Sequence, residues 1–198
     1  MVRRRTFLFG LASLLPLSAC GPQAPPYQDP LADISGARIG DVPVDAPVRA
    51  GTTVAYTVGS NVERWLKYVD EGNKYAASVG ASQQLLAAGN PQNVINGAVA
   101  ILRRRYPDIQ LVDDLATAAR RHIATTFALD IQSKWGALPG SEITSDIAII
   151  AFDAQQHPVS RISGHGVSIV RPYVTPDPLE APQKAIAELS AKADRLLS

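Results

Sequence analysis

The chain has 198 residues, of which 46% are hydrophobic, a length and composition that suit one domain with a single buried core. Its formal net charge of +1 excludes a protein that attracts nucleic acid through bulk positive charge, and its single cysteine excludes an internal disulfide and a thiolate metal cluster. Stability must therefore come from packing.

Residues 1–19 have the organisation of an export signal. Arginines at positions 3–5 form a positive region, and an apolar stretch follows over residues 7–17. This stretch has the length of the apolar region of a secretory signal, about 7–15 residues, and is shorter than the roughly 20 residues of a permanent transmembrane helix. We therefore expect residues 1–19 to be a signal peptide that is removed on export.

The cysteine stands directly after this segment, in the string Leu17-Ser18-Ala19-Cys20. The string resembles the lipobox of bacterial lipoproteins, whose pattern is Leu, a small residue, Ala or Gly, then Cys. The resemblance implies cleavage between Ala19 and Cys20, diacylglycerol on the Cys20 sulfur and an acyl chain such as palmitate on its new amino group. Two or three acyl chains hold a protein at a membrane far more firmly than one. A signal peptide with a chance cysteine, or a buried free thiol, is the alternative.

Arg4 and Arg5 begin a second motif, RRTFL over residues 4–8. It resembles the twin-arginine (Tat) export signal, which implies folding in the cytoplasm before export. Arg3 and Phe9 depart from the residues usual beside that pattern, so the general secretory route is the alternative. Gly21 stands where an Asp favours inner-membrane retention in well-studied lipoproteins. The resemblance therefore implies a periplasm-facing domain anchored in the outer membrane rather than the inner one.

Residues 20–50 are predicted to be the lipidated cysteine and a proline-rich tether. The stretch GPQAPPYQDP over residues 21–30 contains four prolines, which excludes a helix or a central strand. Ten residues in polyproline conformation would hold a domain roughly 30 Å from the lipid surface. A short edge strand is predicted over residues 37–44.

The first half of the domain predicts one strand and several helices. Residues 52–58 alternate β-branched and aromatic residues with small ones and predict a strand. Helical spacing over residues 61–86 is interrupted by glycines, which predicts two short helices or one helix and a loop. Asn90 as N-cap and Pro91 in the first turn begin a clear helix that ends on the arginines at 103–105.

The second half alternates strands and helices. The apolar patterns predict strands at residues 109–112, 124–132, 143–152 and 159–170. The last two of these form a β-hairpin. A helix over residues 113–122 is predicted to be capped by Asp113, and an amphipathic helix over residues 185–197 closes the chain.

The sequence thus predicts one α/β (α+β) domain over residues 51–198, with a mixed sheet of about four or five strands, helices mainly on one face and a closing amphipathic helix. The order of IQLVDD (109–114), a helix, a strand, a hairpin and AIAELSAKADRLL (185–197) resembles the small α/β domain of envelope-assembly lipoproteins. Examples are the curli-secretion lipoprotein, the lipoprotein activators of penicillin-binding proteins and the amino-terminal domain of TolB. The resemblance covers residues 90–197 and implies docking to partners at loops or strand edges.

The string Ser163-Gly164-His165-Gly166 is the most unusual local pattern in the chain. Its two glycines predict a β-bulge or the close approach of another backbone. A catalytic histidine that works with Ser163 or an acid is the alternative. Because the chain lacks G-x-S-x-G, HExxH and glycine-rich phosphate loops, we assign no catalytic residue and expect neither a metal nor a cofactor.

Two groups of arginines end successive predicted helices, namely Arg103, Arg104, Arg105, Arg120 and Arg121. They are candidates for binding an anionic lipid or glycan. The alternative is that each group only stabilises the end of its own helix.

These observations favour a non-catalytic lipoprotein, anchored to the membrane through Cys20, that binds or docks in cell-envelope assembly or transport. We expect an envelope protein as its partner and no nucleic acid. A periplasmic hydrolase that uses His165 is one alternative, so enzymatic activity stays open although its absence is favoured. A carrier of a small ligand or lipid is the other, and it predicts a deep apolar cavity between the sheet and the helices.

Overall fold

The computed structural model describes residues 25–32, 37–78, 92–134, 142–169 and 180–197. Arg4, Arg5, Ala19 and Cys20 lie outside these residues, as do the predicted helix cap at Asn90 and the proline that follows it. The signal peptide, the lipidation site and this cap therefore stay predictions. None of the helices in the described part of the chain is long and apolar enough to span a bilayer.

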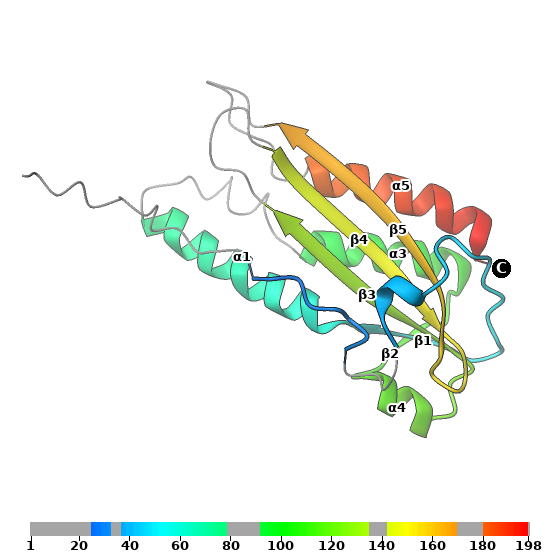
Figure 1. Cartoon of the computed structure of the whole chain (residues 1–198). Coiled ribbons are helices and arrows are strands. Elements are labelled where there is room, and N and C mark those ends of the chain that lie inside the picture. The colour runs from blue at the N-terminus through cyan, green and yellow to red at the C-terminus, as the bar shows by residue number, and fades with distance from the viewer. Residues whose placement is uncertain (1–24, 33–36, 79–91, 135–141, 170–179, 198) are drawn as a thin grey trace, which may run out of the picture.

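A five-stranded mixed sheet forms the centre of the domain, with strand order β2-β1-β3-β4-β5 (Figure 1). Its strands are β1 (Val54–Val58), β2 (Gln110–Leu111), β3 (Thr125–Lys134), β4 (Glu142–Phe152) and β5 (Pro158–Ile169). Strand β1 pairs in parallel with β2 and β3, whereas β3, β4 and β5 pair antiparallel. The predicted hairpin and the predicted mixed sheet are both confirmed.

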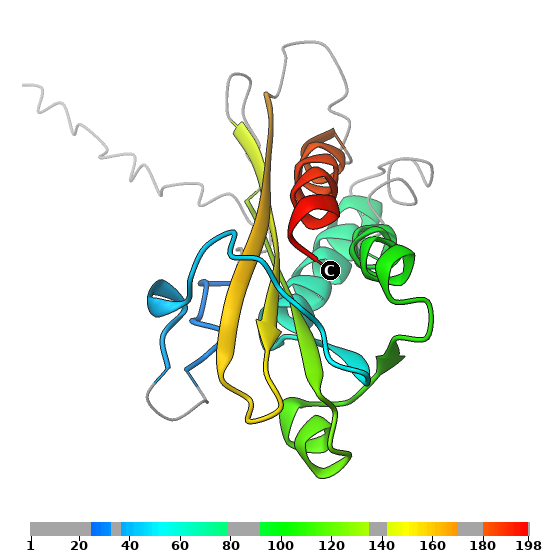
Figure 2. The ribbon, with the colours of Figure 1, turned by 90° about the vertical axis from the view of Figure 1, so that its right-hand side faces the viewer.

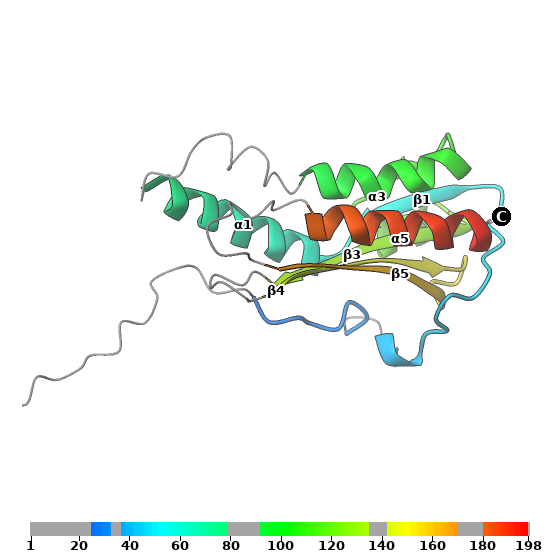
Figure 3. The same cartoon turned by 90° about the horizontal axis from the view of Figure 1, so that it is seen from above.

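Three long helices cover one face of this sheet, as Figures 2 and 3 show. They are α1 (Ser60–Ser78), α3 (Gln92–Arg105) and the closing helix α5 (Glu180–Leu196). A short helix, α4 (Leu115–Arg120), lies apart from this layer. Helix α1 runs without a break through Gly72, so the one-helix alternative holds over residues 60–78. The arginines at 103–105 end α3 as predicted.

The main core lies between the sheet and the helices. Phe127, Leu129 and Ile131 alternate along β3 and are all fully buried there, as the period-two pattern predicts. Ile147 and Ile149 continue the same face on β4. This face is apolar along most of β3 and β4, and is interrupted near one end by the buried side chains of Ser133 and Ser145, which hydrogen-bond to each other at 3.2 Å.

The opposite face is covered by the amino-terminal part of the described chain, residues 27–32 and 37–48, which we name the strap (Figure 2). Leu31 and Val42 of the strap are buried against Ile150 and Phe152 of β4 and form a second apolar cluster. At the end of the strap, the Val48 N–H donates to the carbonyl of Leu196, the last residue of α5 (2.7 Å). Part of the segment in which the sequence predicts a tether therefore packs on the sheet.

The predicted edge strand over residues 37–44 is wrong. The chain forms a 3-10 helix there, η1 (Ile39–Asp41), and its β-pairing with the sheet is limited to a single bridge between Val44 and Arg161. Pro43 lacks an N–H for a ladder, and Asp45 takes a positive φ of 52°, which turns the backbone away from a strand.

The predicted cap of α4 is also wrong, by one residue. Asp114, rather than Asp113, is the N-cap, and its carboxylate accepts a hydrogen bond from the Thr117 N–H at 2.6 Å. Hydrogen bonds from the side chain and from the backbone N–H of Thr117 hold the pKa of Asp114 below its ordinary value. Two adjacent aspartates offer the same capping group, so the sequence alone does not decide between them.

Candidate functional site

A polar cleft opens on the strap face of the sheet, between the strap and the middle of β5. It has a volume of about 200 Å³. Its charged and hydrogen-bonding side chains are Tyr27, Asp130, Gln132, Asp146, Arg161, Ser163, His165 and Glu188. We name this set the polar cleft.

Asp130 is the buried centre of the cleft, with only 5% of its surface exposed. Its carboxylate accepts hydrogen bonds from the Tyr27 hydroxyl and from the Asn61 amide, both at 2.9 Å. Burial raises the pKa of Asp130, and these two hydrogen bonds offset part of that rise. Burial and the neighbouring Asp130 charge raise the pKa of Tyr27 in turn. Asp130 therefore fixes Tyr27 at the cleft and depends on it for a partner.

Asn61 joins the strap to the helical layer. Its side chain accepts from the Gln28 N–H (3.2 Å) and donates to the Gln28 carbonyl (2.7 Å), as a neighbouring strand would. Arg64, one turn along α1, donates to the side-chain oxygen Oδ1 of Asn61 (2.5 Å) and to the Gln28 side chain. The start of the strap is thus held by directed hydrogen bonds as well as by apolar burial.

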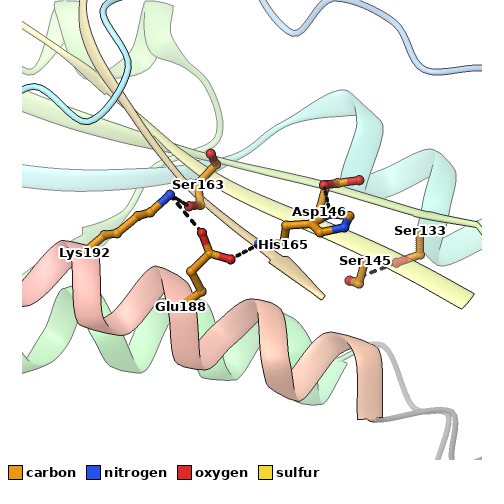
Figure 4. Close-up of polar contacts among 7 residues, drawn as sticks. All are labelled: Ser133, Ser145, Asp146, Ser163, His165, Glu188 and Lys192. Atoms are coloured by element: carbon orange, nitrogen blue, oxygen red, sulfur yellow. Dashed lines mark hydrogen bonds and ion pairs between the residues drawn. The ribbon is translucent and has the colours of Figure 1, made fainter. Parts of the chain in front are cut away.

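His165 and Asp146 are opposite each other on β5 and β4. The His165 Nδ1 atom lies 2.7 Å from an Asp146 carboxylate oxygen, and both side chains are about half exposed (Figure 4). Ser163 lies two residues earlier on β5, which separates same-face neighbours by about 6.6 Å. Among the described residues no hydrogen bond links the Ser163 hydroxyl to His165. The pair that a serine nucleophile needs is therefore not assembled in this structure.

The two glycines beside His165 allow helix α5 to touch the strand. A Cβ atom at Gly164 would lie 1.9 Å from the Ala185 carbonyl oxygen, and one at Gly166 would lie 1.9 Å from that of Ala181. The close approach of another backbone is confirmed. The alternative of a bulge at His165 is wrong, because the register shift of this hairpin lies at Ala151 and Phe152.

The close packing brings three side chains of α5 onto the outer edge of β5, and Figure 4 shows two of them, Glu188 and Lys192. Lys192 donates to the Ser163 carbonyl (2.8 Å), Glu188 accepts from the His165 N–H (3.0 Å), and Lys184 donates to the Val167 carbonyl (2.9 Å). Four helical residues span about 6 Å and two strand residues about 6.6 Å, so the two spacings match. We name this set the edge ladder.

The edge ladder is also an ion-paired row. Lys192 lies 2.9 Å from Glu188 and 3.3 Å from Asp45 of the strap. The hydrogen bond from the His165 N–H, followed by that from Lys192, lowers the pKa of Glu188. The hydrogen bond to Glu188 raises the pKa of Lys192. Nearer the hairpin, Arg161 exchanges backbone hydrogen bonds with Pro43 and Asp45, so the strap continues the cover of the same edge.

The predicted arginine groups sit on separate helices. Arg104 of α3 donates to Ser190 (2.6 Å) and lies 3.5 Å from Asp194, both on α5. Arg120 of α4 donates to Thr117 on its own helix (2.7 Å). Figures 1 and 2 show α3 and α4 well apart, so the groups do not adjoin. Anion binding by these arginines stays a prediction.

Tyr27, Asn61 and Asp130 were not singled out by sequence reasoning. The available signal was Asp130 itself, an acid in the middle of an otherwise apolar alternating strand. A buried acid of this kind requires partners. Within the described ranges, no group of three or more His, Cys, Asp or Glu side chains is arranged to hold a metal ion.

Comparison with known proteins gives distant structural similarity only. No protein-family model and no curated protein matches the chain. Among solved structures, it is similar to the PelC dodecamer from Paraburkholderia phytofirmans, with 11% identity and a TM-score of 0.38 over 75% of this chain and 92% of that one. A leucine-to-methionine variant of that dodecamer has the same identity of 11% and the same TM-score of 0.38, over 74% of this chain and 92% of that one. Similarity of this size supports no statement about activity, ligand or assembly.

Proposed function

We propose that the chain is a lipoprotein of the cell envelope whose domain is held close to a membrane and binds a partner protein at the polar cleft. The observation that carries the proposal is the contact between Tyr27 and Asp130, which docks the chain only a few residues after Cys20. An extended chain spans at most about 3.6 Å per residue. Tyr27 would therefore stand within about 25 Å of the lipidated cysteine.

This short connection would set the orientation of the domain as well as its distance from the membrane. Tyr27 lines the cleft, so the cleft would lie on the side of the domain from which the anchor leaves. The tether of ten free residues expected from the sequence would shrink to the few residues before Pro25. In this proposal the protein is exported by the twin-arginine route and anchored in the outer membrane, with its domain in the periplasm.

The composition of the cleft supports a protein partner. It combines the half-exposed aromatic ring of Tyr27 with Arg161 and with acidic groups of opposite charge. Tyrosine and arginine are enriched in the centres of protein interfaces. Because the edge ladder engages three backbone groups of β5 between Ser163 and Val167, the partner would contact side chains rather than add a strand at this edge.

The anchor is tested by Cys20→Ala in the full-length chain. We expect the lipid adducts to disappear from the mass of the protein and the protein to leave the membrane fraction. The control is Ser18→Ala, which keeps the small residue of the lipobox. An unmodified thiol at Cys20 in the native protein would overturn the anchored reading.

The cleft is tested by a photocrosslinking amino acid placed at His165 in cells. We expect one discrete adduct with an envelope protein, and no such adduct from the same amino acid at Asn93, which is exposed on α3 in the helical layer. Equal adducts from both positions, or none from His165, would contradict the proposal. His165→Gln should leave docking intact, because glutamine can still bond to Asp146, whereas a histidine-dependent hydrolase would lose its activity.

A further inference from the structure

A second concave surface lies at the other edge of the sheet, between β1, β2 and helices α1 and α3. It has a volume of about 580 Å³, within the range of small-molecule sites. Its apolar lining consists of Tyr56, Val58, Leu66, Ile95, Val99, Ala100 and Leu111. We name it the edge groove. It shares no lining residue with the polar cleft, so nothing below rests on the proposed function.

The groove exists because β2 is short. Gln110 and Leu111 pair with Ala55 and Tyr56, and β2 ends there, so Val58 has no β2 residue beside it. Helices α1 and α3 still cover this part of the sheet (Figure 3). Leu111 is consequently 58% exposed at the mouth of the groove. Apolar side chains at such an incomplete edge are unfavourably hydrated, so a ligand that covers them gains from the hydrophobic effect.

One continuous stripe of α3 forms the wall of the groove and ends in positive charge. Ile95 and Val99 lie on this stripe one turn apart, and Arg103 and Arg104 follow at its end. The Arg104 side chain is engaged by α5, whereas the Arg103 side chain has neither a hydrogen bond nor an ion pair within the described part of the chain. The arginines outweigh the half negative charge of the helix end. Glu63 is the acid that lines the groove from α1.

We propose that the edge groove binds a single-chain amphiphile, with its apolar chain along the floor and its anionic head group at Arg103. The charge complementarity comes from Arg103 and Arg104, and the chain complementarity from the apolar stripe that leads away from them. A ligand of this class would contact both the arginines at the end of α3 and the apolar face of the same helix, two features that the sequence indicates separately.

The test uses the full-length protein and a photoreactive dodecanoate whose chain carries a diazirine. We expect light-dependent labelling of the peptides that contain residues 54–58 and 92–105. Arg103→Gln should reduce the labelling at least fivefold, whereas Arg121→Gln, at the end of α4, should leave it unchanged. The matching diazirine dodecanol should label the wild type more weakly, and Arg103→Gln should not reduce that weaker labelling further.

A second pair of variants blocks the groove without touching the arginines. Asn96 and Asn93 are both exposed on α3, but only Asn96 lines the groove. Asn96→Trp should abolish the labelling and Asn93→Trp should retain it, with circular dichroism confirming equal folding of both variants. Equal labelling of both tryptophan variants, or equal labelling by the acid and the alcohol, would overturn the proposal.

A competition experiment separates a free amphiphile from the membrane surface. Unlabelled dodecanoate should compete with the probe, and added vesicles of phosphatidylglycerol should not. Competition by the vesicles alone would mean that the groove faces a bilayer rather than holding a single chain, and would also overturn the proposal.

Discussion

The two faces of the sheet are built from the same strands but are stabilised differently. The face under α1, α3 and α5 is apolar along most of its length, apart from the buried pair Ser133 and Ser145 near one end, and is covered by long helices. The face under the strap is apolar only near Ile150 and Phe152, and becomes polar around Asp130 and His165. An element without regular structure can therefore complete a core, provided that it supplies a few buried side chains and leaves the polar groups accessible.

The helical face should be the more sensitive of the two to added volume. Gly164→Ala places a Cβ atom against the backbone of α5, so the helix must move away from the strand. We expect the free energy of unfolding to fall by more than about 3 kcal/mol. Gly40→Ala in η1 is the control, since nothing lies within 4 Å of its new Cβ atom. Urea unfolding of both variants measures the difference, and a Gly164→Ala protein of unchanged stability would refute the close packing.

The strap face should lose less, but still a large amount, when its apolar anchor is shortened. Leu31→Ala removes a fully buried side chain from the cluster with Phe152. We expect a loss of about 2–3 kcal/mol in the free energy of unfolding. Val44→Ala, in the same segment but 62% exposed, should change it by less than about 0.5 kcal/mol. If both variants behave alike, the strap contributes little to the domain.

The buried acid gives the strap face a pH dependence. Burial raises the pKa of Asp130, so between its unfolded and folded pKa values the folded state binds more protons than the unfolded chain. The free energy of unfolding should therefore fall as the pH rises through that interval, above the ordinary value for aspartate of about 4. In Asp130→Asn this fall should disappear, because the amide does not titrate and can still bond to Asn61 and Tyr27. Urea unfolding at a series of pH values tests this, and equal slopes would contradict it.

The smallest effect is expected at the edge ladder, beside both faces. Glu188→Ala removes the acceptor of the His165 N–H and the partner of Lys192, at a cost of about 1 kcal/mol. Hydrogen exchange of the His165 amide should become faster. Asp70→Ala breaks only an exposed ion pair with Lys74 on α1 and should leave that amide unchanged. Unchanged exchange in Glu188→Ala would show that the ladder does not protect the edge.

The helical face could be predicted from the sequence because each of its elements carries its own periodic pattern. Phe127, Leu129 and Ile131 mark a strand without reference to any other part of the chain. The strap could not be predicted in this way, because prolines and glycines indicate a tether whether or not Leu31 finds a place on the sheet. Leu31 is buried against residues of β4, which lie more than a hundred positions further along the sequence.

The polar groups of the cleft escaped prediction for the same reason. Tyr27 and Asp130 are 103 residues apart, and Asn61 and Asp130 are 69 apart. No local pattern joins them. The glycines beside His165 were a usable signal, since only a very close neighbour explains them at those positions. The sequence offered a bulge and close packing as equal explanations, and helix α5 decides between them.

The edge ladder can form only late in synthesis, because its side chains all belong to the last helix. Until residues 180–197 leave the ribosome and dock, the carbonyls of Ser163 and Val167 and the amide of His165 lack these partners. During that interval β5 is a template on which a strand of another nascent molecule can add. A premature stop codon before α5 would make this transient hazard permanent, and the product should be found in aggregates rather than as a shortened domain.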